Sequence, residues 1–229
     1  MPIQQMLLGI PTPDSGANVS VSFDGTNDYL NIPDSSVFAL GTDNFTIECF
    51  YKPASGSSSY DCIVSFGWRF QLYYVSNQFE YYCQDSSSYF LNGDNTGSSS
   101  VSENTWYHLA ITRSGSTFKI FLDGVEKEST THSDTFGDPA YDAAIGRFSP
   151  TTQYYAQGLI SNFRFTRGQA LYTSNFTKPS APLTTTSQGA TASNVKLLCC
   201  NIENDPAGST VTPSTITNYG ATASSDGPF

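Results

Sequence analysis

The sequence predicts an all-β protein built as a two-sheet antiparallel β-sandwich. Three observations predict this fold class. Short runs in which apolar and polar residues alternate recur along the 229 residues, Gly, Asn, Asp and Ser separate these runs, and no stretch of useful length shows a helical period. Many short strands with such turn spacing favour a sandwich or jelly roll over a parallel sheet. Because sandwiches of this size commonly form one domain, we expect a single core with short arms.

The clearest element is the stretch NTWYHLAITRSGSTFKIFLDGV, which covers residues 104–125. Its period of two places odd-numbered residues of 107–111 on one face of a strand and even-numbered residues of 106–110 on the other. The alternation resumes after a Ser-Gly-Ser turn, and Asp123-Gly124 can adopt the positive φ that a tight hairpin needs. Two consecutive hairpins are therefore predicted.

Strand-like runs also precede and follow this stretch. They are VSVSF (19–23), DYLNI (28–32), FTIECFY (45–51), DCIVSFG (61–67), RFQLYYV (69–75), QFEYYC (78–83), AAIGRF (143–148), GLISNFRFT (158–166) and NVKLLCCNI (194–202). The first 17 residues contain three prolines and no strand-length alternation, and the last segment is rich in Ser, Thr, Gly and Pro. We therefore predict an N-terminal docking arm over 1–17, a sandwich domain over 18–202 and an extended C-terminal tail over 203–229.

Composition and charge limit the partners of the chain. Ten basic and twenty acidic residues give a net charge of −10, which repels phosphate backbones and anionic lipid, so nucleic acid and membrane are not expected as partners. The start MPIQQMLLGIPTP has neither a basic segment nor a long apolar one, so we expect no signal peptide and no membrane anchor. Only 13% of residues are charged. A surface covered largely by Ser, Thr, Asn, Gln and Tyr suits a secreted or particle-bound β protein.

The five cysteines do not form the pattern of a zinc site. Cys49, Cys62, Cys83, Cys199 and Cys200 include no CxxC pair and have no neighbouring histidine ligands. Cys49 and Cys83 lie in strand-like runs, where we expect small buried hydrophobic residues with reduced thiols. The odd number argues against a complete disulfide framework, although a single bridge stays open. Adjacent Cys199 and Cys200 are expected to point to opposite faces of a strand.

Four segments together resemble the laminin-G-like, concanavalin A-like jelly-roll family. They are VSFDGTNDYLNIP (21–33), DNFTIECFYKP (43–53), residues 104–125 and GLISNFRF (158–165), and they occur in the family's order. The resemblance implies a hairpin signature in which Trp106 anchors between the sheets and Asp123-Gly124 forms the turn. Phe50 occupies a position where the family usually carries Trp, which preserves the hydrophobic contribution.

A second, narrower resemblance bears on function. MPIQQMLLG (1–9), TRGQALYTSNFTKPSAPL (166–183), VKLLCCN (195–201) and DGPF (226–229) are similar to segments of virion proteins of bacteriophages, especially marine ones. The resemblance implies a non-enzymatic structural protein, synthesised in the cytoplasm of a bacterial host and displayed on the virion surface as capsid decoration or as a tail fibre or appendage. Its expected partners are other virion proteins, a host-surface glycan and further copies in a homo-oligomer.

The arm contains a small apolar cluster, Met6, Leu7 and Leu8. We interpret it as the segment that docks onto a particle lattice, where an extended segment becomes ordered on binding. The alternative is that these three side chains cover the end of their own sandwich.

Catalysis finds little support in the sequence, so we predict that the protein is not an enzyme. Glycoside hydrolases with this sandwich need paired carboxylates, typically Glu-x-Asp-x-x-Glu. Glu203 and Asp205 begin such a pattern, but Gly208 replaces the second Glu. His108 and His132 are the two histidines, and nothing near either resembles a nucleophile elbow. A soluble carbohydrate-binding lectin is the main alternative function, and a glycoside hydrolase is less favoured.

Calcium is the one metal for which the sequence offers candidate ligands. Asp134, Asp138 and Asp142 lie in one loop, and Asp24 and Asp28 lie in another. Acidic residues in turns also cap their own backbone and face water, so this is a weak prediction. No other cofactor is expected.

Paired tyrosines are the most informative candidates for a binding surface. They are Tyr73, Tyr74, Tyr81, Tyr82, Tyr154 and Tyr155, with Trp68 and Tyr89 nearby in sequence. Because adjacent strand residues point to opposite faces, one tyrosine of each strand pair should leave the core. Outward tyrosines suit stacking on sugar rings or a subunit interface, and burial under a neighbouring strand is the third interpretation.

Overall fold

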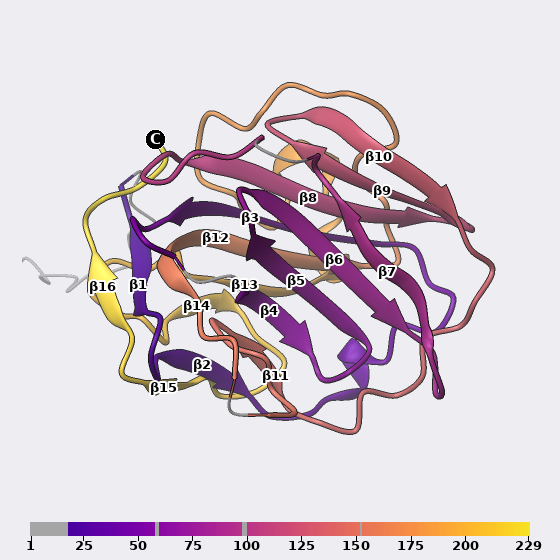
Figure 1. The fold of residues 1–229 in the computed structure, drawn as a ribbon, viewed down its shortest axis with the longest axis horizontal. Coiled ribbons are helices and arrows are strands. Elements are labelled where there is room, and N and C mark those ends of the chain that lie inside the picture. Colours follow the sequence, from indigo (N-terminus) through magenta and orange to yellow (C-terminus); the bar gives the residue numbers. More distant parts are fainter. Residues whose placement is uncertain (1–17, 58–59, 98–99, 152) are drawn as a thin grey trace, which may run out of the picture.

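A computed structural model describes residues 18–57, 60–97, 100–151 and 153–229 as two antiparallel sheets packed face to face. In Figure 1 strands β4 to β7 of the seven-stranded sheet lie in front of the nine-stranded sheet. The predicted all-β sandwich is confirmed. Met6, Leu7 and Leu8 lie outside the described residues.

The nine-stranded sheet has the order β10-β9-β8-β3-β12-β1-β16, with β13 paired to β12 and β14 paired to β13. Its strands are β1 (Ser20–Asp24), β3 (Phe45–Pro53), β8 (Tyr107–Ser114), β9 (Thr117–Leu122), β10 (Val125–Thr131), β12 (Gln157–Arg167), β13 (Val195–Cys199), β14 (Ser209–Val211) and β16 (Thr222–Ser224). The seven-stranded sheet has the order β15-β2-β11-β4-β5-β6-β7. Its strands are β2 (Tyr29–Ile32), β4 (Asp61–Phe66), β5 (Phe70–Val75), β6 (Gln78–Gln84), β7 (Tyr89–Asn95), β11 (Ala143–Ile145) and β15 (Thr217–Tyr219).

Helical structure in the described part of the chain is limited to three-residue 3-10 turns at Ser36–Phe38, Ser187–Gly189 and Ala192–Asn194. None of these turns is long and apolar enough to cross a bilayer.

The central hairpins form as the alternation predicts. β8 pairs with β9 so that Ile111 lies opposite Ile120, and both side chains are buried between the sheets. The turn to β10 has positive φ at Asp123 and at Gly124. A Cβ on Gly124 would clash with the carbonyl oxygen of Phe176, which belongs to residues 168–194. This glycine is therefore required by its close approach to that segment as well as by the turn.

Residues 168–194, which we call the covering segment, lie over the outer face of the nine-stranded sheet. Outward side chains of β3 and β8 are buried beneath it, including Phe50 and Ala110, which contact Leu183 and Tyr172 respectively within apolar clusters. Both faces of the central strands β3 and β8 are therefore covered, whereas a pocket opens on the outer face of the opposite sheet.

Two expectations about side-chain direction are corrected by the structure. Trp106 does not anchor between the sheets; its indole packs on the outer cluster around Phe50, and its Nε1 donates to Asp226 Oδ1 at 3.0 Å. Cys199 and Cys200 do not point to opposite faces, because Cys200 has a φ of 57° and both side chains are buried in the same core. That left-handed residue ends the strand alternation of β13.

Residues 203–229, expected as an extended tail, run back along the sandwich and add short strands to both sheets. β14 and β16 join the nine-stranded sheet, and β15 joins the seven-stranded sheet beside β2. Lys52 and Trp106 both donate to the carboxylate of Asp226, and the ring of Phe229 lies 4.9 Å from that of Phe50. The last residues therefore close one edge of the sandwich.

Candidate functional site

The outer face of the seven-stranded sheet carries an aromatic surface, and strand alternation determines which tyrosines reach it. Tyr74 on β5 and Tyr81 on β6 point into the core and are 2% and 1% exposed. Tyr73 and Tyr82, their chain neighbours, therefore point outward and pack with Cys62 and Phe148 in a separate cluster. The prediction that one tyrosine of each strand pair leaves the core is confirmed.

A pocket of about 320 Å³ opens on this face. Its lining consists of seven aromatic and three polar side chains: Tyr60, Trp68, Tyr73, Tyr82, Tyr89, Phe148 and Tyr154, with Gln71, Thr151 and Gln153. The volume lies at the lower end of the range of small-ligand pockets, about 300–1,000 Å³, and the mixture of apolar walls with a few polar groups is typical of such sites.

Tyr73 lines the pocket and packs against three other aromatic rings. Its ring centre lies 5.6 Å from that of Tyr82 and 6.0 Å from those of Tyr60 and Tyr154, all nearly perpendicular. Trp68 meets the ring of Phe148 edge to face at 4.8 Å. Such edge-to-face pairs each add about 0.5–1.5 kcal/mol beyond the burial of area, so the rings are fixed before any ligand arrives.

Polar atoms around the aromatic surface are either oriented by the protein or left without a partner. Gln71 Nε2 donates to the carbonyl of Gly67 at 3.2 Å, which fixes its amide. Tyr82 donates its hydroxyl to Glu80 Oε2 at 2.9 Å. Thr151 Oγ1 is buried and has no hydrogen-bond partner among the described residues. This oxygen is covered by the protein, so the oriented polar groups of the surface are those of Gln71 and Tyr82.

Three of the tyrosines that line the pocket, Tyr73, Tyr82 and Tyr89, keep their hydroxyl protons. Burial raises the pKa of Tyr73, and burial with the hydrogen bond to Glu80 raises that of Tyr82. Burial also raises the pKa of Tyr89. The pocket therefore offers neutral phenols, which present an apolar ring face and a hydroxyl donor at one end.

This arrangement suits the binding of a ring with one apolar face and hydroxyl groups at its rim. Sugar rings have that character, and rigid aromatic side chains are suited to stack on them. Among the described residues that line the pocket, none is acidic, histidine or cysteine. The paired carboxylates that glycoside hydrolysis requires are therefore not part of this lining.

The sequence matches the family model of the concanavalin A-like lectin/glucanases superfamily over residues 24–171. The chain belongs to this superfamily. No curated protein matches its sequence.

Solved structures of the same architecture support the fold. A Bacteroides ovatus ATCC 8483 protein to which carbohydrate binding is ascribed has a TM-score of 0.71 and 14% identity, over 91% of this chain and 60% of that protein. The SAP-like pentraxin of Limulus polyphemus, a heptamer, has a TM-score of 0.51 and 15% identity over 90% and 94% of the two chains. This superfamily protein thus spans 60% of the length of the Bacteroides protein, and at these identities the likeness concerns the fold alone.

Of the six tyrosines predicted from the sequence, the structure brings three to the pocket: Tyr73, Tyr82 and Tyr154. Tyr155 lies beside it, where its ring centre is 6.3 Å from that of Tyr29. Tyr60 and Phe148 line the pocket without having been singled out, and Trp68 and Tyr89 were noted only as neighbours. Phe148 falls within a predicted strand run, but only the fold places its ring against Trp68.

The calcium candidates do not form one site. Asp142 accepts hydrogen bonds from Asn31 Nδ2 and the amide of Asp34, and Asp134 lies 3.4 Å from His132. Asp138 caps the amide of Ala140 in its own loop. No group of three acidic, histidine or cysteine side chains in the described part of the chain is arranged to hold a metal ion.

The second loop proposed for calcium is likewise engaged in turn contacts. Asp24 Oδ1 accepts from the amides of Thr26 and Asn27, and Asp28 Oδ2 accepts from the amide of Asp24. These are the local capping bonds that acidic residues make in turns.

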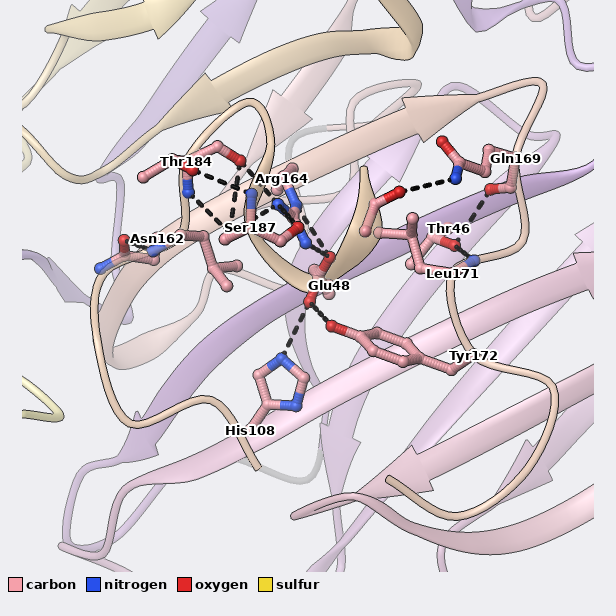
Figure 2. Close-up of polar contacts among 12 residues, drawn as sticks. Thr46, Glu48, His108, Asn162, Arg164, Gln169, Leu171, Tyr172, Thr184 and Ser187 are labelled. Atoms are coloured by element: carbon pink, nitrogen blue, oxygen red, sulfur yellow. Dashed lines mark hydrogen bonds and ion pairs between the residues drawn. The ribbon is translucent and has the colours of Figure 1, made fainter. Parts of the chain in front are cut away.

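A buried polar cluster lies on the opposite side of the molecule, beneath the covering segment (Figure 2). Glu48 accepts hydrogen bonds from Arg164, from His108 Nε2 at 3.1 Å and from Tyr172 Oη at 2.8 Å. Glu48, His108 and Arg164 are fully buried, so this cluster has no access for a substrate. His108 is therefore a packed, hydrogen-bonded side chain of the sheet, with Glu48 as its partner.

The Glu48 cluster serves to fasten the covering segment. Arg164 Nη1 donates to the carbonyls of Thr184 and Ser187, and Thr46 Oγ1 both donates to the carbonyl of Gln169 and accepts from the amide of Leu171 (Figure 2). Buried side chains of the sheet thus satisfy backbone groups of a segment that contains no β-strand, as buried polar groups require.

Proposed function

We propose that this protein is a non-enzymatic, lectin-like domain that binds carbohydrate in the aromatic pocket of its seven-stranded sheet. The single observation that carries the proposal is the set of outward rings that pack around Tyr73 and line an open pocket. Membership of the concanavalin A-like lectin/glucanases superfamily supports it, as does the likeness to a protein described as carbohydrate binding.

The test is a glycan array followed by calorimetry on the best ligand. Trp68→Ala should weaken binding about tenfold or more, because interface tryptophans are often hot spots. Tyr141→Ala is the matched control: its side chain is a large exposed aromatic outside the pocket lining, and its loss should leave affinity unchanged. Absence of binding to any glycan would contradict the proposal. Turnover of a bound polysaccharide would instead favour the glycoside hydrolase.

We further propose that the domain is carried on a bacteriophage virion, as capsid decoration or as a tail fibre or appendage, where the pocket would meet host-surface glycans. Support comes from the similarity of residues 1–9, 166–183, 195–201 and 226–229 to segments of phage virion proteins. The low share of charged residues, 13%, is in keeping with display on a particle.

Antibody-labelled electron microscopy of purified particles tests this placement. Label on heads supports decoration, label on tails supports a fibre or appendage, and particles without label contradict the virion role. Deleting residues 1–13 should abolish incorporation while the sandwich stays folded, if Met6, Leu7 and Leu8 dock the arm. Incorporation of the truncated protein at normal copy number would refute that role.

A further inference from the structure

The five arginines of this chain differ in how they are used. Four of them are engaged: Arg69, Arg113 and Arg167 donate to backbone carbonyls, Arg167 also pairs with Asp43, and Arg164 pairs with Glu48. Arg147 is different. Its guanidinium makes no hydrogen bond and no ion pair with any described residue, and its Nε is buried without a partner.

Arg147 is held in place by aromatic rings. Its guanidinium carbon lies 3.7 Å from the ring centre of Tyr29, and the ring of Tyr219 is stacked on Tyr29 at 4.4 Å with an angle of 8° between the planes. At these distances one ring face has no room for both groups, so the guanidinium and Tyr219 occupy opposite faces of Tyr29. Stacking of this kind orients a guanidinium without using its hydrogen-bond donors.

The stack lies next to the aromatic pocket. Arg147 immediately precedes Phe148, which lines the pocket, and Tyr29 is 6.3 Å from Tyr155, the chain neighbour of the lining residue Tyr154. Tyr219 is 46% exposed at the outer edge of the sheet. A ligand that fills the pocket and extends toward β2 and β15 would therefore pass over Arg147.

We propose that Arg147, Tyr29 and Tyr219 form a second subsite, which binds the carboxylate of an acidic sugar unit next to the unit stacked in the pocket. This inference rests on the proposed carbohydrate binding. A planar guanidinium with free donors matches a carboxylate in a bidentate fork, and charge-assisted bonds of this type are stronger than neutral ones.

Net charge narrows the ligand further. The chain carries a net charge of −10, so the protein as a whole repels a polysaccharide that is negatively charged at every sugar unit. A single carboxylate beside Arg147 is instead attracted by the nearby guanidinium. The subsite thus selects glycans with isolated acidic units, such as a terminal uronic acid on a neutral oligosaccharide.

The experiment compares oligosaccharide pairs that differ only in a terminal glucuronic acid or glucose, measured by calorimetry. Wild type should bind the acidic member about tenfold or more tightly than the neutral one, as expected for charge-assisted hydrogen bonds. Arg147→Gln should remove this preference and leave the affinity for the neutral member unchanged. Arg147→Lys, which keeps the positive charge but cannot donate two parallel hydrogen bonds, should retain only part of the preference for the acidic oligosaccharide. Unfolding midpoints of both variants serve as the folding control.

The outcomes separate the subsite from the pocket. The subsite proposal is overturned if wild type binds the acidic and the neutral oligosaccharide equally. It is also overturned if Arg147→Gln still prefers the acidic one. Either result leaves the pocket proposal intact. Tighter binding of a sulfate ester than of the matched uronic acid overturns the carboxylate assignment. If wild type binds neither member nor any array glycan, the proposed function and the subsite fail together. The pocket and the subsite are both supported if Trp68→Ala weakens the binding of both oligosaccharides and if the preference for the acidic one is seen only in proteins that keep Arg147.

Discussion

Arg164 donates two hydrogen bonds to one carboxylate oxygen of Glu48, from Nε at 2.9 Å and from Nη2 at 2.6 Å. The two residues are register partners on β12 and β3, and both are fully buried. Through Nη1 the same guanidinium binds Thr184 and Ser187 of the covering segment. The pair therefore joins two neighbouring strands to the segment that seals them from water.

Removing one member of this pair should strongly destabilise the fold. Glu48→Ala leaves a buried guanidinium without its counter-charge, and such a loss costs about 3–5 kcal/mol of the free energy of unfolding. The measurement is chemical denaturation with linear extrapolation. Glu126→Ala, which breaks the partly exposed pair with Lys119, is the control and should cost less than about 1 kcal/mol. Equal effects of the two substitutions would show that the buried pair has no special role.

Acid should weaken the same region. Burial alone would raise the pKa of Glu48, but the hydrogen bond from His108 and the charge of Arg164 outweigh it and hold the pKa below its ordinary value of 4.5. A lowered carboxyl pKa adds stability that is present above the ordinary value and is lost as pH falls through the lower, folded-state value. Unfolding free energy should therefore decrease below about pH 4.5.

The variant Glu48→Gln isolates this contribution. Asp24, Asp85 and Asp226, which lie outside the core, also have lowered pKa values, through hydrogen bonds from backbone amides or from Lys52, and they add to the acid dependence of both proteins. The difference between wild type and Glu48→Gln should shrink as the pH falls through this range. A constant difference from pH 6 to pH 3 would show that Glu48 does not titrate in the folded protein.

All five cysteines should be unreactive in the folded protein. Each is buried and free, and burial raises the pKa of the Cys49, Cys62 and Cys83 thiols. Reaction with a thiol reagent under native conditions should be negligible, and five thiols should appear after unfolding, since only the exposed thiolate reacts. Fewer than five after unfolding without reductant would indicate a disulfide. Rapid native labelling would contradict the burial.

Truncation before Ser225 should destabilise the sandwich by about 1–3 kcal/mol. It removes Asp226, to which Lys52 and Trp106 donate and whose carbonyl accepts from Ser20, together with the ring of Phe229 that packs on Phe50. Thermal unfolding measures the effect. An unchanged midpoint would mean that these last residues do not close the edge of the sandwich.

The outward tyrosines were predictable from the sequence, whereas their surroundings were not. Alternation alone separates Tyr73 from Tyr74 and Tyr82 from Tyr81, because a strand has a fixed period of two. Trp68 and Phe148 meet only because β4 pairs with both β5 and β11, and no local pattern encodes a contact between residues eighty positions apart. The pocket therefore emerges from sheet order.

The convergence of the buried residues around Glu48 was likewise not predictable from the sequence. Glu48, His108, Arg164 and Tyr172 come from β3, β8, β12 and the covering segment, and each looks like an ordinary polar residue in its own strand. Their convergence depends on registers such as Glu48 opposite Ala110 and Arg164. The misplacement of Trp106 has a related origin. The alternation places Trp106 on the same side as His108 and Ala110, as observed, but it does not show that the covering segment buries this side.

The most direct test of the account uses the two tryptophans of the chain, Trp68 and Trp106. Trp106→Phe leaves Trp68, in the pocket lining, as the single tryptophan, and its selectively excited emission can be titrated with a glycan that calorimetry shows to bind. We predict a saturable change in Trp68 emission with the calorimetric dissociation constant. Binding without any change in Trp68 emission would place the sugar elsewhere and contradict the central claim.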